Sequence, residues 1–407
     1  MSDSLSHITV LDLSRILAGP WATQVLGDLG ADVIKIERPG TGDDTRGWGP
    51  PFVRDAETGK DADAAYYLCA NRNKRSVTVD FTTAEGQAIV ARLARRADVL
   101  IENFKVGGLA AYGLDYASLK KINPRLIYCS ITGFGQTGPY AARAGYDFLV
   151  QAMGGLMSVT GRKDGEPGAG PQKAGVALTD ILTGLYASIG ILAALAHRER
   201  TGEGQYLDVA LLDVQVACLA NQAMNYLVSG EAPRRLGNAH PNIVPYQDFP
   251  TSDGFMIIAV GNDGQFVKLC AELQVPELAL DPRYARNQDR VANRKTLIEA
   301  LCAVTVLQPT SHWVGRLEAV GVPCGPINAL DAVFDDAQVR ARELAIAIPH
   351  AVAGSVPSVA SPLRLSGTPV SYRAAPPALG AQTREVLQQL LAMTDAEIDA
   401  LAQRGIV

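Results

Sequence analysis

Short apolar runs alternate with longer segments of helical apolar spacing over the first 135 residues of the chain. The runs are rich in valine, leucine and isoleucine and predict β-strands at residues 8–13, 31–37, 76–81, 98–102 and 125–131. Two segments between them, 20–29 and 83–97, predict α-helices. Apolar strands joined through helices are typical of a buried parallel sheet with right-handed crossovers. The pattern therefore predicts an open, Rossmann-like α/β fold.

The loops that follow these strands are rich in asparagine, glycine, lysine and arginine. They are residues 14–19, 38–40, 82–83, 103–107 and 132–138. Open parallel sheets bind ligands in the crevice beyond the carboxyl ends of their strands. We therefore expect these loops to line one site, and their composition suits a polar, phosphorylated ligand.

The remainder of the chain is helical first and mixed later. Residues 175–230 are mostly helical, with a short strand at 205–209 and a helix over 211–227. Residues 246–260 predict a hairpin that turns at Ser252-Asp253-Gly254. Further helices are predicted at 265–273, 292–305, 310–320, 383–391 and 395–403, with a linker containing short strands at 349–377.

Residues 174–196 form an apolar segment whose single charge is Asp180. A charge near a bilayer centre is costly, and the run after Asp180 is short for a membrane span, so we expect a buried core helix. A carboxylate in such surroundings is costly unless it is paired or functional. Asp180 is therefore either the N-cap of this helix or a nucleophile that attacks an activated acyl group.

Composition narrows the function classes. The chain has 407 residues, 47% of them hydrophobic, and a net charge of −5, which gives no electrostatic case for binding nucleic acid. The six cysteines contain no CxxC pair, so neither a disulfide framework nor a zinc site is indicated. The polar N-terminal segment has no features of a signal or transit peptide. We expect a cytoplasmic protein without a metal or a membrane anchor.

Common catalytic and nucleotide-binding motifs are missing from the sequence. No GxGxxG follows the early strands, and the chain contains no P-loop, no HExxH and no GxSxG elbow. The five histidines are not spaced as metal ligands. What remains is a ligand-binding parallel sheet and one unusual carboxylate.

An ordered set of motifs carries a resemblance that spans nearly the whole chain. The motifs are RILAGP at 15–20, LGDLGADVIKIERPG at 26–40, NRNKRS at 71–76, ENF at 102–104, GFG at 133–135, AGYD at 144–147, DILTG at 180–184 and TGEG at 201–204. Together they resemble the class III CoA-transferase family. The resemblance implies an α/β large domain over residues 1–225, a smaller α+β domain over 226–330, and a linker and C-terminal part over 331–407 that returns to the large domain. It also implies an interlocked, ring-like homodimer.

The resemblance implies a role for the aspartate and for the strand-end loops. Asp180 matches the family's catalytic aspartate, which forms an acyl anhydride and then a thioester with CoA. The residues implied to bind CoA are Ile16, Leu17 and Ala18 along the pantetheine, Arg38 at a phosphate, and Val79, Thr82, Asn103, Phe104 and Lys105 toward the adenine and ribose. CoA enters as a thioester substrate, and no permanently bound cofactor is implied.

The implied reaction moves CoA from an acyl-CoA to a free acid. The expected donor is succinyl-CoA, and the expected acceptor is a dicarboxylate such as glutarate. The residues implied to meet the substrate are Trp48, Tyr146, Asp147, His240, Gly261 and Asn262, with residues 261–264 as a candidate lid and donor loop. A dicarboxylate needs a cation for its distal carboxylate. The candidates are Arg15, Arg46, Arg143 and His240, and the sequence does not rank them.

A second branch of the family offers an alternative function. Its racemases place a histidine, used as an acid and base, at the position of Tyr146. A phenol with an ordinary pKa near 10 is a poor base at neutral pH, so a transferase is favoured over a 2-methylacyl-CoA racemase. A formate or oxalate substrate is disfavoured as well, because the chain has VGNDG at 260–264 where formyl-CoA transferases carry a run of glycines.

Overall fold

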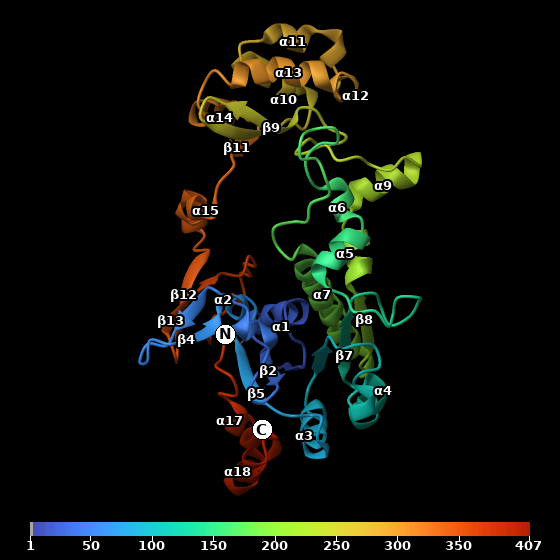
Figure 1. Ribbon diagram of the computed structural model, residues 1–407, viewed down its shortest axis with the longest axis vertical. Coiled ribbons are helices and arrows are strands. Elements are labelled where there is room, and N and C mark those ends of the chain that lie inside the picture. The colour runs from blue at the N-terminus through green and yellow to red at the C-terminus, as the bar shows by residue number, and fades with distance from the viewer. Residues whose placement is uncertain (1–2) are drawn as a thin grey trace. The chain divides into compact units, whose positions relative to one another are not determined.

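A computed structural model describes residues 3–407 of the chain, and their contacts group into two compact units (Figure 1). The sheet unit comprises the chain up to Leu156, Ala174–Met224 and Gln338–Val407. The hairpin unit comprises Met157–Lys173 and Asn225–Ala337. One segment, Met157–Lys173, groups with the hairpin unit although the expected domain boundaries assign it to the first part of the chain.

The sheet unit is built on a six-stranded sheet in which every pair of neighbours is parallel. Its order is β5 (Lys74–Thr78), β2 (Asp32–Glu37), β1 (Thr9–Asp12), β6 (Val99–Glu102), β7 (Ile127–Thr132) and β8 (Tyr206–Ala210). The predicted strands and their parallel pairing are confirmed, except that the strand predicted at 76–81 begins at Lys74 and ends at Thr78. The chain runs outward from β1 in one direction to β5 and then in the other to β8, so the loops after β1 and β6 border the crevice at which such sheets bind ligands.

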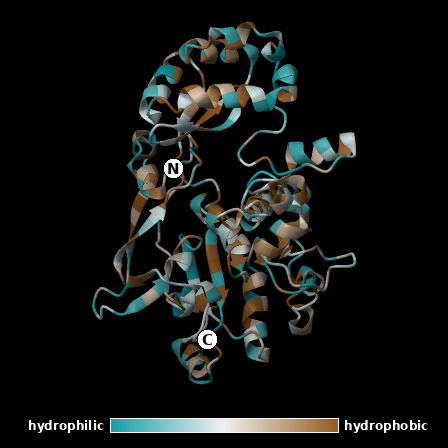
Figure 2. Ribbon diagram, turned by 45° about the horizontal axis from the view of Figure 1, so that its top comes forward, coloured by the Kyte–Doolittle hydropathy of each residue, from teal (hydrophilic) through white to brown (hydrophobic). Residues whose placement is uncertain are grey.

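Helices cover both faces of this sheet because its apolar side chains alternate between two cores. Leu11, Ile34 and Leu100 pack into one core with α3 (Ala84–Ala94), α17 (Thr383–Leu391) and α18 (Asp395–Gln403). Their neighbours Val10, Val33 and Val99 pack into the other core with α1 (Ala18–Asp28) and α7 (Leu178–Thr201). The strands are hydrophobic along much of their length, as expected for a sheet buried on both sides (Figure 2).

Helix α7 realises the predicted apolar helix, but only one of its faces is buried. It is the one helix within residues 3–407 that is long and apolar enough to span a membrane by length and composition. Its buried face includes Gly184, Ala187 and Ile191 and lies against α1. A Cβ at Gly184 would lie 2.7 Å from the carbonyl oxygen of Ala18, so the two helices make a close backbone contact there. The opposite face remains exposed.

The other elements of the sheet unit surround this core. They are η1 (Asp44–Gly47), β3 (Phe52–Arg54), β4 (Asp61–Ala64), α2 (Ala65–Leu68), η2 (Ala110–Tyr112), α4 (Tyr116–Ile122), α5 (Asp147–Met153), α8 (Leu211–Ala217), β12 (Ala345–His350) and β13 (Gly354–Val359). Three of the four boundaries between the units fall inside helices, namely α6 (Leu156–Val159), α9 (Ala220–Ser229) and α16 (Ala337–Ala341). The single helix predicted over 211–227 is therefore wrong: α8 ends at Ala217, and α9 starts with Ala220 at a φ of 45°, which a continuous helix does not allow.

The hairpin unit has its own sheet and its own core. Strands β9 (Tyr246–Thr251) and β10 (Gly254–Ala259) form the predicted hairpin, and β11 (Cys324–Pro326) pairs with β10. The helices are α10 (Asp263–Glu272), α11 (Pro276–Leu280), η3 (Pro282–Tyr284), α12 (Asn287–Ala292), α13 (Arg294–Thr305), α14 (Thr310–Ala319) and α15 (Leu330–Asp335). Phe249, Ile258 and Leu297 are fully buried among them, so this unit is a compact body with an apolar centre.

Candidate active site

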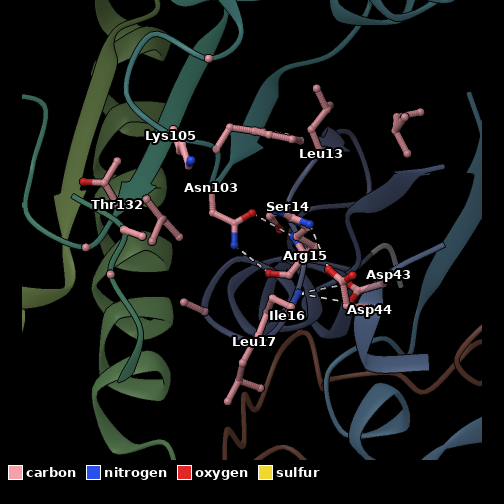
Figure 3. A pocket seen from close by; sticks show the side chains of 18 of the residues that line it. Leu13, Ser14, Arg15, Ile16, Leu17, Asp43, Asp44, Asn103, Lys105 and Thr132 are labelled. Atoms are coloured by element: carbon pink, nitrogen blue, oxygen red, sulfur yellow. Dashed lines mark hydrogen bonds and ion pairs between the residues drawn. The ribbon is translucent and has the colours of Figure 1, made fainter. Parts of the chain in front are cut away.

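A cavity of about 590 Å³ opens at the carboxyl ends of the parallel strands, within the sheet unit (Figure 3). All five predicted strand-end loops contribute to its wall, through residues that include Ser14–Ala18, Arg38, Thr82, Asn103–Val106, Thr132 and Gly133. The expectation that these loops gather around one site is confirmed. Every CoA-binding residue implied by the resemblance lines this cavity: Ile16, Leu17, Ala18, Arg38, Val79, Thr82, Asn103, Phe104 and Lys105. Their contacts with CoA stay a prediction.

The loop after β1 is held in a strained conformation at the cavity wall. Ile16 has a φ of 73°, an outlier for a β-branched residue that costs about 1–3 kcal/mol. Asn103 binds the preceding peptide with both ends of its amide: Oδ1 accepts from Arg15 N–H at 3.0 Å, and Nδ2 donates to the Arg15 carbonyl at 2.7 Å. Figure 3 shows Asn103 on one side of this loop and Asp43 on the other.

A buried ion pair supports the loop from the second side. Asp43 accepts from the Ile16 N–H at 3.2 Å and from Lys35 Nζ at 2.9 Å, and Lys35 also donates to the Ser14 carbonyl at 2.8 Å. Burial alone would raise the pKa of Asp43, but the charge of Lys35 and the hydrogen bonds from Lys35 and Thr45 outweigh it and lower the pKa to about 2. Asp43 therefore stays charged and keeps hold of the Ile16 amide at any physiological pH.

Asp180 lies in the first turn of α7 and lines the same cavity. It is not the N-cap: the cap position is Ala177, and the capping acceptor is Asp147 at the start of α5. Asp147 Oδ1 accepts from Thr179 N–H at 2.8 Å and from Asp180 N–H at 3.2 Å. The N-cap interpretation of Asp180 is therefore wrong, because a carboxylate distant in sequence satisfies the helix amides and leaves the Asp180 side chain uncommitted.

The surroundings of Asp180 keep its carboxyl group reactive. Burial, reinforced by the negative charge of Asp147, raises its pKa from 3.8 to about 7. No group in residues 3–407 donates a hydrogen bond to its carboxylate oxygens. Tyr66 is close enough for burial and the charge of Asp180 to raise the pKa of its phenol to about 12, so Tyr66 stays protonated and is able only to donate toward an anion.

Not all substrate-binding predictions fall on the cavity wall. Tyr146 lines it and is 65% exposed. Trp48 is not among the lining residues and packs edge-on against Tyr66 with a centroid distance of 5.3 Å. Asp147 also stands behind the wall, where it holds the start of α7. The structure thus gives Asp147 a supporting place beside Asp180 rather than a contact with the open cavity.

Arg46 is wrong as a cation for substrate, because its guanidinium is buried and fully engaged. It donates to both oxygens of Glu37 at 2.9 and 2.7 Å and to Asp63 at 2.8 Å. The same group lies over the ring of Tyr67 at 3.8 Å from the centroid. A guanidinium with two carboxylate partners has no free edge for a third.

The remaining predicted substrate residues belong to the hairpin unit. His240 Nδ1 accepts from Asn242 N–H at 3.1 Å, and the ring packs against Tyr246. Asn262 is the N-cap of α10, and its Oδ1 accepts from Gln265 N–H at 2.9 Å. The Gly261 N–H donates to Gln265 Oε1 at 2.8 Å, so this amide of the candidate donor loop already has a partner inside its own unit.

Three residues of the site are not predicted from the sequence as members of it: Lys35, Asp43 and Tyr66. A signal for Lys35 was available, since it interrupts the apolar run of β2 and a lysine at a buried strand position needs an anionic partner. Asp43 precedes a short helical turn, where aspartate is a common cap, and its side chain does accept from Thr45 N–H. Nothing in the sequence around Tyr66 indicates its closeness to Asp180.

Comparisons with known proteins agree on one family. Residues 5–383 match the family model of CoA-transferase family III. A protein of Agrobacterium fabrum named succinate–glutarate CoA-transferase is 54% identical over 386 residues, which are 95% of each chain. The succinyl-CoA:glutarate CoA-transferase of Mus musculus is 45% identical over 403 residues, 99% of this chain and 90% of its own. The crystal structure of a CAIB/BAIF family protein from Brucella suis superposes with a TM-score of 0.83 at 52% identity, covering 96% of this chain and 100% of that one.

Proposed function

The chain belongs to CoA-transferase family III and is an enzyme that transfers CoA, and we propose that it does so from succinyl-CoA to glutarate through a covalent intermediate on Asp180. The observation that carries the mechanism is the Asp180 carboxyl group itself. It lines the cavity of the strand-end loops, has a pKa raised to about 7, and accepts no hydrogen bond from residues 3–407. The names of the two relatives support the choice of donor and acceptor.

The first half of the reaction transfers CoA onto the enzyme. A carboxylate oxygen of Asp180 attacks the thioester carbonyl of succinyl-CoA, the carbon–sulfur bond breaks, and a mixed anhydride and the CoA thiolate result. The thiolate then attacks the Asp180 carbonyl of the anhydride, which releases succinate and leaves an aspartyl-CoA thioester. No net proton is taken up or lost, so the sequence of steps needs no histidine at the position of Tyr146.

The second half reverses these steps with the new acid. A glutarate carboxylate attacks the aspartyl thioester to form an aspartyl-glutaryl anhydride and CoA thiolate. The thiolate attacks the glutaryl carbonyl, which gives glutaryl-CoA and restores the Asp180 carboxylate. Both anhydrides are sensitive to water, so the reaction depends on a site that excludes it, and the partly buried position of Asp180 at the base of α7 suits that need.

The cavity wall offers cations for the phosphates of CoA. Arg38 follows β2 and Lys105 follows β6, and both side chains are exposed at the cavity. A guanidinium is suited to bidentate phosphate binding, and an ammonium acts as a point charge. We assign the nucleotide end of CoA to these two residues and the pantetheine to Ile16, Leu17 and Ala18, which connect that end of the cavity to α1.

The assembly proposed with this function is a homodimer. The exposed face of α7 carries large apolar residues, with exposures of 40% at Leu185, 47% at Tyr186, 62% at Ile189 and 36% at Leu192. These residues follow one another at helical spacing, and an apolar stripe of this kind on a soluble enzyme marks an interaction surface. A second copy of the same chain is the occupant that we propose.

The test of the proposed function compares the wild-type enzyme with Asp180→Asn. Wild-type enzyme with succinyl-CoA and glutarate should form glutaryl-CoA, seen by mass spectrometry, and hydroxylamine should trap an acylated Asp180. Asp180→Asn should lose at least about 10³-fold in rate and still bind CoA. Retention of more than about 1% of the rate would argue against the covalent intermediate. Exchange of an α-proton of a 2-methylacyl-CoA into deuterated water would instead favour the racemase.

A further inference from the structure

We infer that Arg143 is the specificity-determining residue that binds the distal carboxylate of the dicarboxylyl group, an inference that rests on the proposed function. Arg143 belongs to the loop between β7 and α5 and lines the same cavity as Tyr146 and Asp180. Both acyl groups of the proposed reaction carry a second carboxylate. A single cation placed beyond the reacting end would therefore serve donor and acceptor alike.

Arg143 differs from two other cations on the cavity wall because it has no carboxylate as an ion-pair partner in the part of the chain that the structure describes. Lys35 is buried against Asp43 at 2.9 Å, and Arg15 is paired with Asp44 at 3.0 Å. Among residues 3–407, the cavity cations with no carboxylate within 4 Å are Arg38, Lys105 and Arg143. Three cations with a free charge are thus available to a ligand that carries phosphates at one end and a carboxylate at the other.

Position along the chain assigns these three cations to different ends. Arg38 and Lys105 follow β2 and β6, whereas Arg143 stands three residues before Tyr146 and four before Asp147, whose side chain accepts from Asp180 N–H. Four residues span at most about 14 Å. An arginine side chain and a five-carbon diacid lying end to end bridge such a distance. The chain therefore keeps Arg143 near the acyl end of the cavity.

Aromatic contacts hold the Arg143 guanidinium without using up its charge. The group lies 4.6 Å from the ring centroid of Tyr140 and 5.2 Å from that of Phe134. Within the described residues 3–407, the one polar contact of its side chain is from Nη2 to the thioether sulfur of Met153 at 3.8 Å, and a thioether is a weak acceptor. A guanidinium fixed by ring faces keeps its N–H edge for a planar anion, which is the geometry of bidentate carboxylate binding.

The charge balance near Asp180 explains why a cation is needed there. Asp180 and Asp147 are close enough for the charge of one to raise the pKa of the other. The distal carboxylate of succinyl-CoA meets repulsion from both, and that of glutarate meets repulsion from Asp147 while Asp180 carries CoA as a neutral thioester. The uncharged end of a monocarboxylic acid meets neither. Arg143 offsets that repulsion for diacids and gives nothing to monoacids, so it selects between them.

The experiment is an internal competition between two acids. Wild type, Arg143→Gln, Arg143→Lys and the control Arg96→Gln each receive succinyl-CoA with glutarate and a hundredfold excess of pentanoate. Arg96 is exposed after α3 and does not line the cavity. The ratio of glutaryl-CoA to pentanoyl-CoA is read by mass spectrometry. Because both acids compete for the same enzyme-bound CoA, this ratio does not depend on donor use or on the amount of active protein.

The expected result is a glutaryl-to-pentanoyl ratio that falls about 10- to 100-fold in Arg143→Gln, falls less in Arg143→Lys and is unchanged in Arg96→Gln. An unchanged ratio with a lower total rate overturns the inference and places Arg143 at CoA or in support of the loop. If Arg143→Gln is inactive, the ratio in Arg143→Lys decides in the same way. Absence of glutaryl-CoA from the wild-type reaction contradicts the proposed function itself.

Discussion

Asp147 prepares Asp180 for catalysis in two ways. It satisfies the Thr179 and Asp180 amides that a helix start leaves without partners, so the side chain of Asp180 is free of the capping role that its position suggests. Burial is the larger cause of the raised pKa of Asp180, and the charge of Asp147 is the second cause. A nucleophile with a pKa near the working pH combines basicity with a sufficient population of the ionised form.

Asp147→Asn should move the pH dependence of the reaction. The amide keeps an oxygen acceptor for the α7 amides but removes the negative charge, so the pKa of Asp180 falls. Since the carboxylate is the attacking form, the rising limb of kcat/KM for succinyl-CoA should shift to lower pH. A pH profile between 5 and 9 measures this, with Asp213→Asn on the exposed side of α8 as the control. An unmoved limb would show that Asp147 supports the helix without tuning the nucleophile.

Asp180→Asn should stabilise the protein at alkaline pH. The folded state binds a proton at Asp180 up to a pH of about 7, whereas the unfolded chain loses it near 3.8. Between these values the folded state holds more protons, so wild-type stability falls as pH rises. The neutral amide removes this cost. The free energy of unfolding at pH 8 should therefore rise by an amount on the order of 2 kcal/mol, measured as a higher thermal midpoint, with a smaller gain at pH 5. A lower midpoint than wild type at pH 8 would contradict the assigned burial cost.

Asn103→Ala should weaken acyl-CoA binding more than it slows turnover. The substitution removes both hydrogen bonds to the Arg15 peptide and lets the strained Ile16 relax. We expect the KM for succinyl-CoA to rise about tenfold with a smaller change in kcat. The control is Asn123→Ala, whose amide also donates to two backbone carbonyls, those of Ala94 and Ala97, but away from the cavity. Equal KM values for the two variants would show that the loop conformation is irrelevant to binding.

At the scale of elements, the contact between α1 and α7 sets the position of the nucleophile. Gly184→Ala places a Cβ 2.7 Å from the Ala18 carbonyl oxygen, a backbone atom that is unable to move aside alone. We expect a loss of about 1–3 kcal/mol in the free energy of unfolding, together with lower activity, because the starts of both helices are displaced. Chemical denaturation and initial rates check both effects.

Gly190→Ala is the matched control, since it lies in the same helix. Its Cβ would meet Leu207 Cδ2 at 2.6 Å, the far end of a flexible side chain, and alanine is the better helix former. Its cost should be much smaller than that of Gly184→Ala. Equal losses in the two variants would assign the effect to helix α7 alone and not to its contact with α1.

Elements with a strong local pattern were predictable, and those decided by distant contacts were not. The strands around Leu11, Ile34 and Leu100 are visible as apolar runs because both faces of the sheet are buried. The break between α8 and α9 has no proline and no glycine to announce it, only Ala220 in a left-handed conformation. The capping of α7 by Asp147 joins residues that are 33 positions apart, so local spacing pointed to Asp180 instead.

At the scale of the whole molecule, the same division holds for the candidate site. The rule that ligands bind beyond the carboxyl ends of parallel strands was sufficient to place five loops around one cavity. Which candidate cation is free to bind substrate depends on the carboxylates that the fold brings next to each of them. Arg46 is paired with Glu37 and Asp63, and Arg15 is paired with Asp44. The sequence therefore predicts the location of the site. It does not predict which charged side chains in that site lack an ion-pair partner and are free to bind substrate.

The exposed face of α7 leads to a prediction about assembly. Ile189 is 62% exposed at the centre of the apolar stripe, on the helix whose first turn carries Asp180. Ile189→Asp puts a charge where the proposed homodimer buries an apolar surface, and an unpaired buried charge opposes association. We expect light scattering after size exclusion to give twice the chain mass of 43.1 kDa for wild type and a monomer for Ile189→Asp.

Leu280→Asp, at an 83% exposed leucine of α11, is the control and should remain dimeric. A monomeric wild type would leave the stripe without its partner and contradict the proposal. Loss of activity on dissociation would further show that the sheet unit needs the second copy to keep α7, and with it the nucleophile, in place.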